Sequence, residues 1–120
     1  MSKVKAYRSR ARKVKKVKVP SGIVFTLKRP KPRDILPLLQ AIWDDSREGE
    51  DVEQLFFKNL DKYSRILLPT VCVEPRVEDK EPSDEWLSVD ELMPGDVIVL
   101  CTEAMELIGF IGEQAVARKK

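Results

Sequence analysis

The first regular pattern along the chain is an alternation of apolar and polar positions near the N-terminus. The segment 23–29 is dense in β-branched and aromatic residues at alternate positions, and the segment 13–19 mixes valine with lysine. Proline, serine and glycine at 20–22 are turn residues, so the two runs predict a β-hairpin over residues 13–29. Because an isolated two-stranded hairpin is only marginally stable in water, we expect this one to pack on another element.

Apolar residues recur at helical spacing further along the chain, near 34–44, 51–68 and 94–108. The middle segment has the clearest amphipathic pattern. Its apolar stripe consists of Val52, Leu55, Phe56, Leu60, Tyr63 and Leu67. Pro69 is expected to break or kink this helix, because proline has no backbone N–H. Residues 70–73 fit either a short helix after the kink or an extended strand.

A long polar segment, 74–91, separates the second predicted helix from the third. It contains 8 Asp or Glu against Arg76 and Lys80, and two prolines interrupt it, so it predicts an acidic loop. Ser88 and Glu91, three residues apart near its end, fit a capping box.

These elements together predict a mainly α (α+β) protein, a small helical domain of about three principal helices with an N-terminal β-hairpin. The length suits a single domain. We place it at residues 13–116, after a flexible basic tail at 1–12 and before a basic C-terminal tail at 117–120. Asp34 is the expected N-cap of the first helix.

Charge is strongly segregated along the chain. Residues 1–33 contain 13 Lys or Arg and no acidic residue, whereas residues 34–120 contain 9 Lys or Arg and 20 Asp or Glu. The net charge of +2 therefore hides a basic arm joined to an acidic body. Such asymmetry favours binding to a polyanion, binding to an acidic protein, or arm-to-body contact between subunits. The candidate binding residues of the arm are Arg8, Arg10, Arg12, Lys13, Lys15, Lys16 and Lys18.

The composition argues against catalysis. The chain has no His, so it has no imidazole base for a nucleophile, and its two isolated cysteines cannot form a four-thiolate zinc site. No glycine-rich phosphate loop occurs. We therefore expect no enzyme activity, no metal and no cofactor, with Cys72 and Cys101 as buried, reduced thiols. No apolar run is long enough for a bilayer and no signal peptide is evident, which favours the cytoplasm and no membrane contact.

Three stretches carry a family resemblance when they are taken in order. They are VPSGIVFTLKRP (19–30), VCVEPRV (71–77) and EWLSVDELMPGDVIVLCTEAM (85–105). Over residues 17–108 the chain resembles the tail assembly chaperones of long-tailed (siphovirus-like) bacteriophages. It departs from that pattern in the final helix, where residues 97–101 are aliphatic and family members usually carry aromatics.

The resemblance implies a largely helical, non-catalytic protein of the infected host's cytoplasm that is absent from the mature virion. It implies binding to the tape-measure protein, which such chaperones keep soluble, and help in recruiting tail-tube subunits during tail and virion assembly. A second function stays open, a small nucleic-acid-binding or regulatory protein that uses the basic arm. Tyr7 is the arm's single aromatic residue and gives it little base-stacking capacity.

The candidate partner-binding residues lie on the final helix and at isolated aromatic positions. The final helix is apolar on more than one face, so it is either a client-binding helix or a covered core helix. Its candidate residues are Val99, Leu100, Met105, Leu107 and Ile108. Trp43 and Phe57 are interface anchors or peripheral core residues. Trp86 either folds the acidic loop onto the body or docks a partner.

The opposite charges of arm and body also predict self-association. An arm-to-body contact between neighbours is heterologous, so it produces rings or open arrays rather than two-fold dimers. We therefore expect a homo-oligomer.

Overall fold

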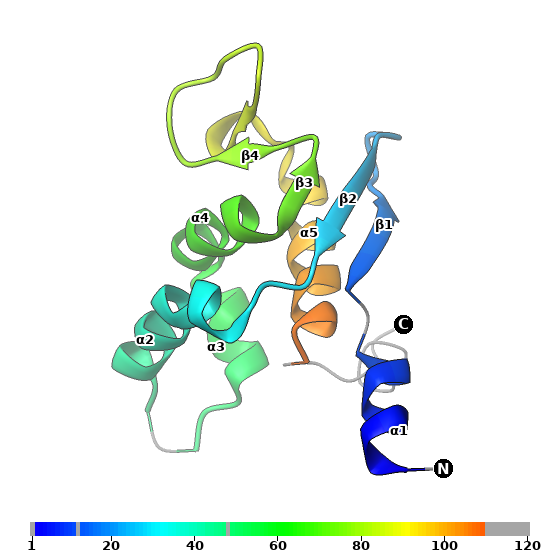
Figure 1. Ribbon diagram of the computed structural model, residues 1–120. Helices are drawn as coiled ribbons and strands as arrows, with labels where there is room; N and C mark the ends of the chain where they lie inside the picture. The colour runs from blue at the N-terminus through cyan, green and yellow to red at the C-terminus, as the bar shows by residue number, and fades with distance from the viewer. Residues whose placement is uncertain (1, 12, 48, 110–120) are drawn as a thin grey trace.

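The computed structural model describes residues 2–11, 13–47 and 49–109, and it is mainly helical with a small antiparallel sheet (Figure 1). The helices are α1 (Lys3–Arg10), α2 (Leu36–Asp45), α3 (Val52–Lys58), α4 (Leu60–Val71) and α5 (Pro94–Leu107), with 3₁₀ turns at Pro32–Ile35 and Val89–Glu91. The strands are β1 (Val14–Lys18), β2 (Val24–Lys28), β3 (Cys72–Glu74), β4 (Val77–Glu78) and β5 (Leu87–Ser88). In Figure 1, α5 lies between the sheet and the group formed by α2, α3 and α4.

The predicted hairpin is confirmed as strands β1 and β2. They pair antiparallel with Val17 opposite Phe25, and the turn places Gly22 at a φ of 95°, a conformation that favours glycine. Phe25 and Leu27 point to the inner side and are buried. The backbone N–H of Ser21 donates to Asp96 Oδ1 at 3.1 Å, which joins the hairpin turn to the start of α5.

The alternatives left open for residues 70–73 are resolved as the end of a helix followed by a strand. Helix α4 passes Pro69 and ends at Val71, two residues later than the predicted break. Proline has no backbone N–H, so Pro69 removes one backbone hydrogen bond from α4. Pro69 lies in the last turn of the helix, and α4 ends two residues later. Cys72 then pairs with Leu27, so β3 extends the hairpin into a three-stranded sheet of order β1-β2-β3.

The predicted single helix at 51–68 is wrong, because the chain forms two helices that meet at Asn59. Asn59 has a non-helical φ of −119° and ψ of 41°, and its side-chain amide donates to the Leu55 carbonyl at 3.1 Å. Asparagine side chains compete in this way with backbone hydrogen bonds.

The first helix also differs from prediction. A 3₁₀ turn occupies Pro32–Ile35 and α2 starts at Leu36, so Asp34 is not the N-cap.

The predicted tail at 1–12 contains helix α1 within the described part. Ser2 caps it, accepting a hydrogen bond from the Lys5 N–H at 3.2 Å, and lysine, alanine and arginine are good helix formers. No residue of α1 is buried, so its sequence has no apolar residues repeating at helical spacing, and the helix could not be predicted from such a pattern. Arg12, the end of the predicted domain at 110–116 and the predicted tail at 117–120 lie outside the described residues.

The predicted acidic loop at 74–91 is a loop with paired ends. Short strands β4 and β5 pair in parallel, with Val77 opposite Leu87, so residues 79–86 leave the body and return to it. The capping box is confirmed: the Ser88 N–H donates to Glu91 Oε2 at 2.7 Å, and the Asp90 N–H donates to Ser88 Oγ. The predicted final helix at 94–108 is confirmed as α5.

Candidate protein-binding surface

Helix α5 is a core helix. Leu100 and Met105 have no exposed surface, Leu107 is buried, and Val99 and Ile108 are half-buried. A fully buried side chain cannot contact a partner while the domain stays folded. Of the two alternatives predicted for this helix, a client-binding helix and a covered core helix, the burial of Leu100, Met105 and Leu107 favours the core helix, so these three residues are not presented to a client. The exposed large apolar residue of this helix is Ile98, at 49%.

Helix α2 presents an apolar stripe to solvent instead. Leu36 is 56% exposed and Trp43 is 78% exposed, while Leu39 between them is half-buried. These positions, i, i+3 and i+7, lie on one face of a helix. The opposite face holds Leu38 and Ile42 in the core. We call Leu36, Leu39 and Trp43 the α2 stripe.

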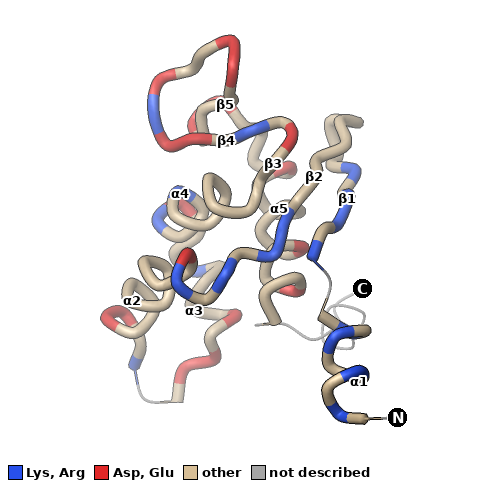
Figure 2. Tube along the Cα trace, in the orientation of Figure 1, with Lys and Arg blue, Asp and Glu red and all other residues tan. Residues whose placement is uncertain are grey.

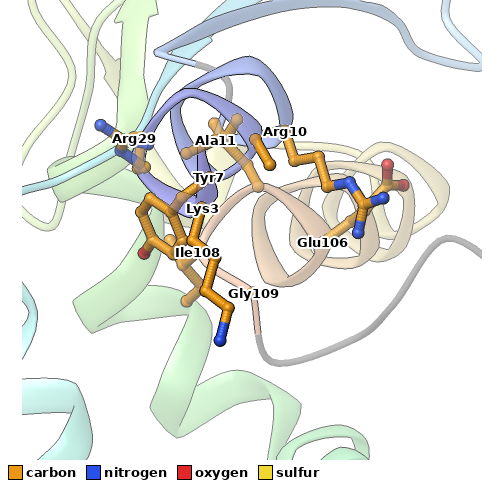
Figure 3. Close-up of a pocket in the computed structure, with 10 residues that line it drawn as sticks. Lys3, Tyr7, Arg10, Ala11, Arg29, Glu106, Ile108 and Gly109 are labelled. Carbon is orange, nitrogen blue, oxygen red and sulfur yellow. The ribbon is translucent and has the colours of Figure 1, made fainter. Parts of the chain in front are cut away.

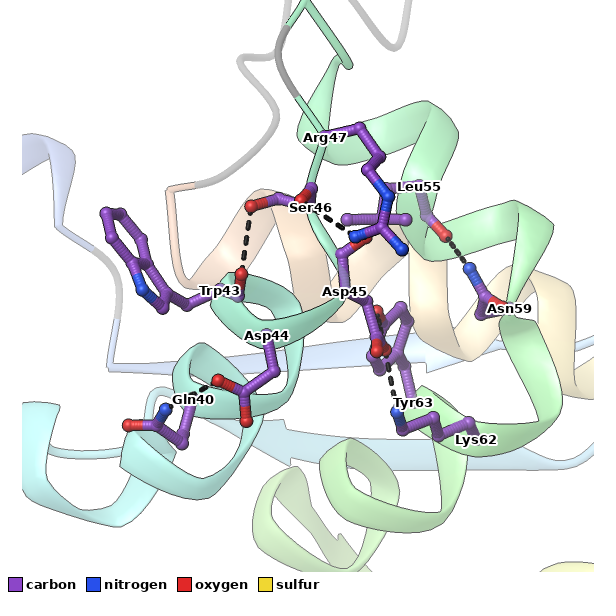
Figure 4. Close-up of polar contacts among 10 residues, drawn as sticks. All are labelled: Gln40, Trp43, Asp44, Asp45, Ser46, Arg47, Leu55, Asn59, Lys62 and Tyr63. Atoms are coloured by element: carbon purple, nitrogen blue, oxygen red, sulfur yellow. Dashed lines mark hydrogen bonds and ion pairs between the residues drawn. The ribbon is translucent and has the colours of Figure 1, made fainter.

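The C-terminal end of α2 is fixed to α4 through Asp45 (Figure 4). Buried Tyr63 donates its hydroxyl to Asp45 Oδ2 at 2.6 Å, and Lys62 Nζ lies 2.7 Å from the same oxygen. The hydrogen bonds from Lys62 and Tyr63 hold the pKa of Asp45 below its usual value. In Figure 4 the indole of Trp43 points away from this cluster. The structure therefore presents Trp43 on an anchored backbone, which lowers the entropy lost when a partner binds.

Phe57, the other aromatic candidate, belongs to the edge of the core. It is half-buried, and its ring packs edge-on against Phe56 with centroids 5.4 Å apart and an interplanar angle of 72°. Of the two candidates, Trp43 is the exposed one.

Trp86 folds the acidic loop. Its indole N–H donates to the Glu81 carbonyl at 2.8 Å, and two cations lie over its ring, with Lys80 Nζ 4.4 Å and the Arg76 guanidinium carbon 5.4 Å from the centroid. Cations over an indole face are attracted to its π electrons. With two cations over its ring and its donor used, Trp86 is half-buried and offers little surface to a partner.

Arg65 joins the acidic loop to α4. Its guanidinium pairs with Asp79 at 2.8 Å, with Asp61 at 3.1 Å and with Asp90. The hydrogen bond from Arg65 lowers the pKa of Asp90. The loop therefore leaves the body from a fixed base, as the arch at the top of Figure 1.

The basic arm is folded, and one of its candidates is used internally. Lys15 lies on the inner side of β1 and pairs with Glu103 and, at 3.3 Å, with Glu106 of α5. Burial lowers the pKa of Lys15, but the hydrogen bonds to these carboxylates outweigh burial and raise it overall. The other described candidates, Arg8, Arg10, Lys13, Lys16 and Lys18, are exposed and have no ion pair with a described residue. Figure 2 shows this basic end apart from the acidic loop.

A pocket of about 480 Å³ opens between α1 and the end of α5 (Figure 3). Tyr7, 75% exposed, lines it from α1. The remaining lining residues are Lys3, Ala6, Arg10, Ala11, Arg29, Glu106, Leu107, Ile108 and Gly109. No residue pattern predicted this pocket, because α1 itself was not predicted.

The two cysteines are buried and unpaired, as predicted. Burial raises the pKa of Cys72 to about 12 and also raises the pKa of Cys101, so both thiols stay protonated at neutral pH. Within the described ranges, no group of three or more Cys, Asp or Glu could hold a metal ion. No described helix is long and apolar enough to cross a bilayer.

Comparisons with protein-family models, with curated proteins and with solved structures found no match to this chain.

Proposed function

We propose that this protein is a phage tail assembly chaperone. In this role it acts without catalysis in the host cytoplasm, binds the tape-measure protein and assists recruitment of tail-tube subunits during tail assembly. The observation that carries the proposal is the α2 stripe, an exposed apolar surface on an anchored helix. The order of the three sequence stretches that resemble tail assembly chaperones supports the same assignment.

An apolar stripe on one helix suits a helical client. An amphipathic client helix can place its own apolar stripe against Leu36 and Trp43, as helices do in groove-binding complexes. Burying a large apolar side chain contributes about 1.5–3 kcal/mol, so two anchors supply about 3–6 kcal/mol. A binding free energy of about −4 kcal/mol corresponds to a millimolar Kd. One copy would therefore bind weakly, and useful affinity requires several copies along one long client.

Self-association would supply those copies, and we propose that the protein forms homo-oligomers through contacts between the basic end and the acidic body. We expect oligomers that grow with protein concentration and dissociate as salt rises, because the Debye length is only ~10 Å at 0.1 M. Sedimentation velocity across a salt series measures this. Deleting residues 1–12, which include α1, should weaken the oligomers. A strictly monomeric protein at high concentration and low salt would contradict the proposal.

Trp43→Ala is the direct test of client binding. We expect this variant to lose co-purification with a co-expressed tape-measure protein, because a buried interface tryptophan typically contributes at least about 2 kcal/mol, or about 30-fold in affinity. The fold should be unaffected, since the side chain is exposed and surface substitutions usually change stability by less than about 0.5 kcal/mol.

Tyr7→Ala is the matched control, because Tyr7 is also an exposed aromatic residue on a helix but belongs to α1 and not to the α2 stripe. It should retain the client. If Trp43→Ala stays folded and binds the tape-measure protein as the parent does, the α2 stripe is not the client site. If neither the parent nor the variants bind it, the assignment as a tail chaperone is wrong.

A further inference from the structure

The basic end of the molecule has the features of a second binding site. We propose that it binds single-stranded nucleic acid, with one base stacked on Tyr7 in the pocket between α1 and α5 and the phosphates following a row of cations on the hairpin. The site shares no residue with the α2 stripe, so it is separate from the proposed client contact. It does include the basic end proposed for oligomer contacts, so nucleic acid and a neighbouring subunit would compete for that end.

The pocket combines an apolar floor with a cationic rim. Its volume of about 480 Å³ is within the usual range for small-ligand sites. Leu107 and Ile108 contribute apolar surface, and Tyr7 presents an accessible aromatic ring. Lys3, Arg10 and Arg29 surround this surface, drawn from α1 and from the residue that follows β2 (Figure 3). The carboxylate of Glu106 also lines the pocket. Lys15 lies 3.3 Å from it but also pairs with Glu103, so this cluster keeps one negative charge beside the three cations. In a nucleotide, the aromatic base would contact the apolar surface and the Tyr7 ring, and the phosphate would contact the surrounding cations.

The cation row leads away from the pocket along the outer face of the hairpin. The Arg29 N–H donates to the Lys13 carbonyl at 2.8 Å, so the strand ends lie together beside α1. In the register, Val14 pairs with Lys28, Lys16 with Thr26, and Lys18 with Val24. Lys16, Lys18 and Lys28 therefore share the outer face, with Lys16 and Lys18 about 7 Å apart as next-but-one residues in a strand. Glu74, opposite Thr26 on β3, borders the row on the far side.

Unpaired charge favours a polyanion over an acidic protein as the occupant. Within the described part of residues 1–33, Lys15 is the single cation with an ion pair. Helix α1 has no buried residue and contains Lys and Arg but no Asp or Glu. It lies beside strand β1, which also contains lysines and no acidic residue (Figure 2). A nucleic acid strand supplies a regular series of phosphates and releases counterions when these cations bind it. It also supplies bases for Tyr7, which an acidic peptide does not.

The test is fluorescence anisotropy of the full chain with labelled oligo-U RNA and oligo-T DNA. Oligonucleotides of about 20 residues exceed the site sizes of about 4–16 nucleotides known for single-strand modules. We expect binding whose log affinity falls with log salt concentration, by about 0.7 per phosphate contacted, between about 50 and 200 mM. The RNA and DNA arms show which sugar the site prefers.

Two variants separate stacking from charge. Tyr7→Ala should weaken binding by about 5- to 150-fold, the usual contribution of one stacked base, and leave the salt slope unchanged. The double variant Lys16→Gln and Lys18→Gln should reduce the salt slope by about 1.4. Lys58→Gln is the charge control, because Lys58 is an exposed lysine on α3 outside the pocket lining, and Trp43→Ala is the aromatic control. Both controls should bind the oligonucleotides as the parent does.

Several results would overturn the proposal. One is the absence of oligonucleotide binding at low salt, and another is binding that Tyr7→Ala leaves unchanged. Competition by a glutamate-rich peptide at the same affinity would identify the surface as an acidic-protein site. Loss of nucleic acid binding in Tyr7→Ala with retention of the tape-measure protein, and the reverse pattern in Trp43→Ala, would separate this proposal from the proposed function.

Discussion

Replacing Leu100 with aspartate is expected to unfold the domain. Leu100 lies in the middle of α5 with no exposed surface, and this helix packs between the sheet and α4. A carboxylate placed there lies in the apolar core, so it must either stay charged in an apolar environment or take up a proton. Either outcome costs several kcal/mol. The total stability of a domain of this size is typically about 5–15 kcal/mol, so most or all of it would be lost.

Ile98→Asp is the matched control, two positions away on the same helix but 49% exposed. It should keep the native circular dichroism spectrum and a urea midpoint near that of the parent, since its carboxylate can remain hydrated. A Leu100→Asp protein with a native spectrum and a normal urea transition would show that α5 is not the core helix, and would reopen the interpretation of α5 as a client-binding surface.

Phe56→Ala is expected to destabilise the domain by about 3–5 kcal/mol. The Phe56 side chain is fully buried at the end of α3, where its ring stacks on Tyr63 of α4 with centroids 5.5 Å apart and an interplanar angle of 29°. Removing it leaves a cavity at the junction of the two helices and also removes the aromatic contact with Phe57. Urea unfolding followed by circular dichroism measures the change in free energy.

The neighbouring residue supplies the control. Phe57 is half-buried, so Phe57→Ala creates less cavity and should cost clearly less than Phe56→Ala, below about 2 kcal/mol. Equal losses at the two positions would mean that the α3–α4 junction packs differently. A loss confined to Phe57 would place Phe57, not Phe56, in the core.

The elements that could be predicted from the sequence are those whose signals are local. The hairpin follows from alternating residues around a turn with Gly22, and the capping box from Ser88 and Glu91. The start of α5 at Pro94 is also local, because proline is well tolerated in the first turn of a helix. None of these features depends on what the segment packs against.

The features that were missed depend on longer-range packing or on side-chain competition. The apolar stripe of α3 and α4 continues across Asn59, since Phe56 and Tyr63 are both buried in the core. The spacing of apolar residues therefore does not reveal that the helix is interrupted at this single residue. Helix α1 has no apolar face and so no period. The apolar residues on more than one face of α5 allowed two interpretations, and its position between the sheet and the other helices, which no local pattern encodes, favours the core helix.

The same limit applies to the candidate site. Trp43 and Phe57 are both aromatic residues on predicted helices, and only the angular position of each on its helix makes one exposed and the other half-buried. Lys15 looks like its neighbours in the arm, but the strand alternation turns it inward to Glu103 and Glu106 of α5, far away in sequence.

The packing of the hairpin on α5 has a consequence for synthesis on the ribosome. Phe25 and Leu27 are made early, yet they belong to the same buried core as Leu100 and Met105 of α5, which are made last among the described elements. The ribosome adds about 5–20 residues per second, so several seconds pass between synthesis of the hairpin and synthesis of α5, the helix that covers its inner face. During this interval the nascent chain exposes an apolar strand flanked by lysines. The like charges of β1 and α1 repel other nascent chains, which limits aggregation until α5 emerges and closes the core.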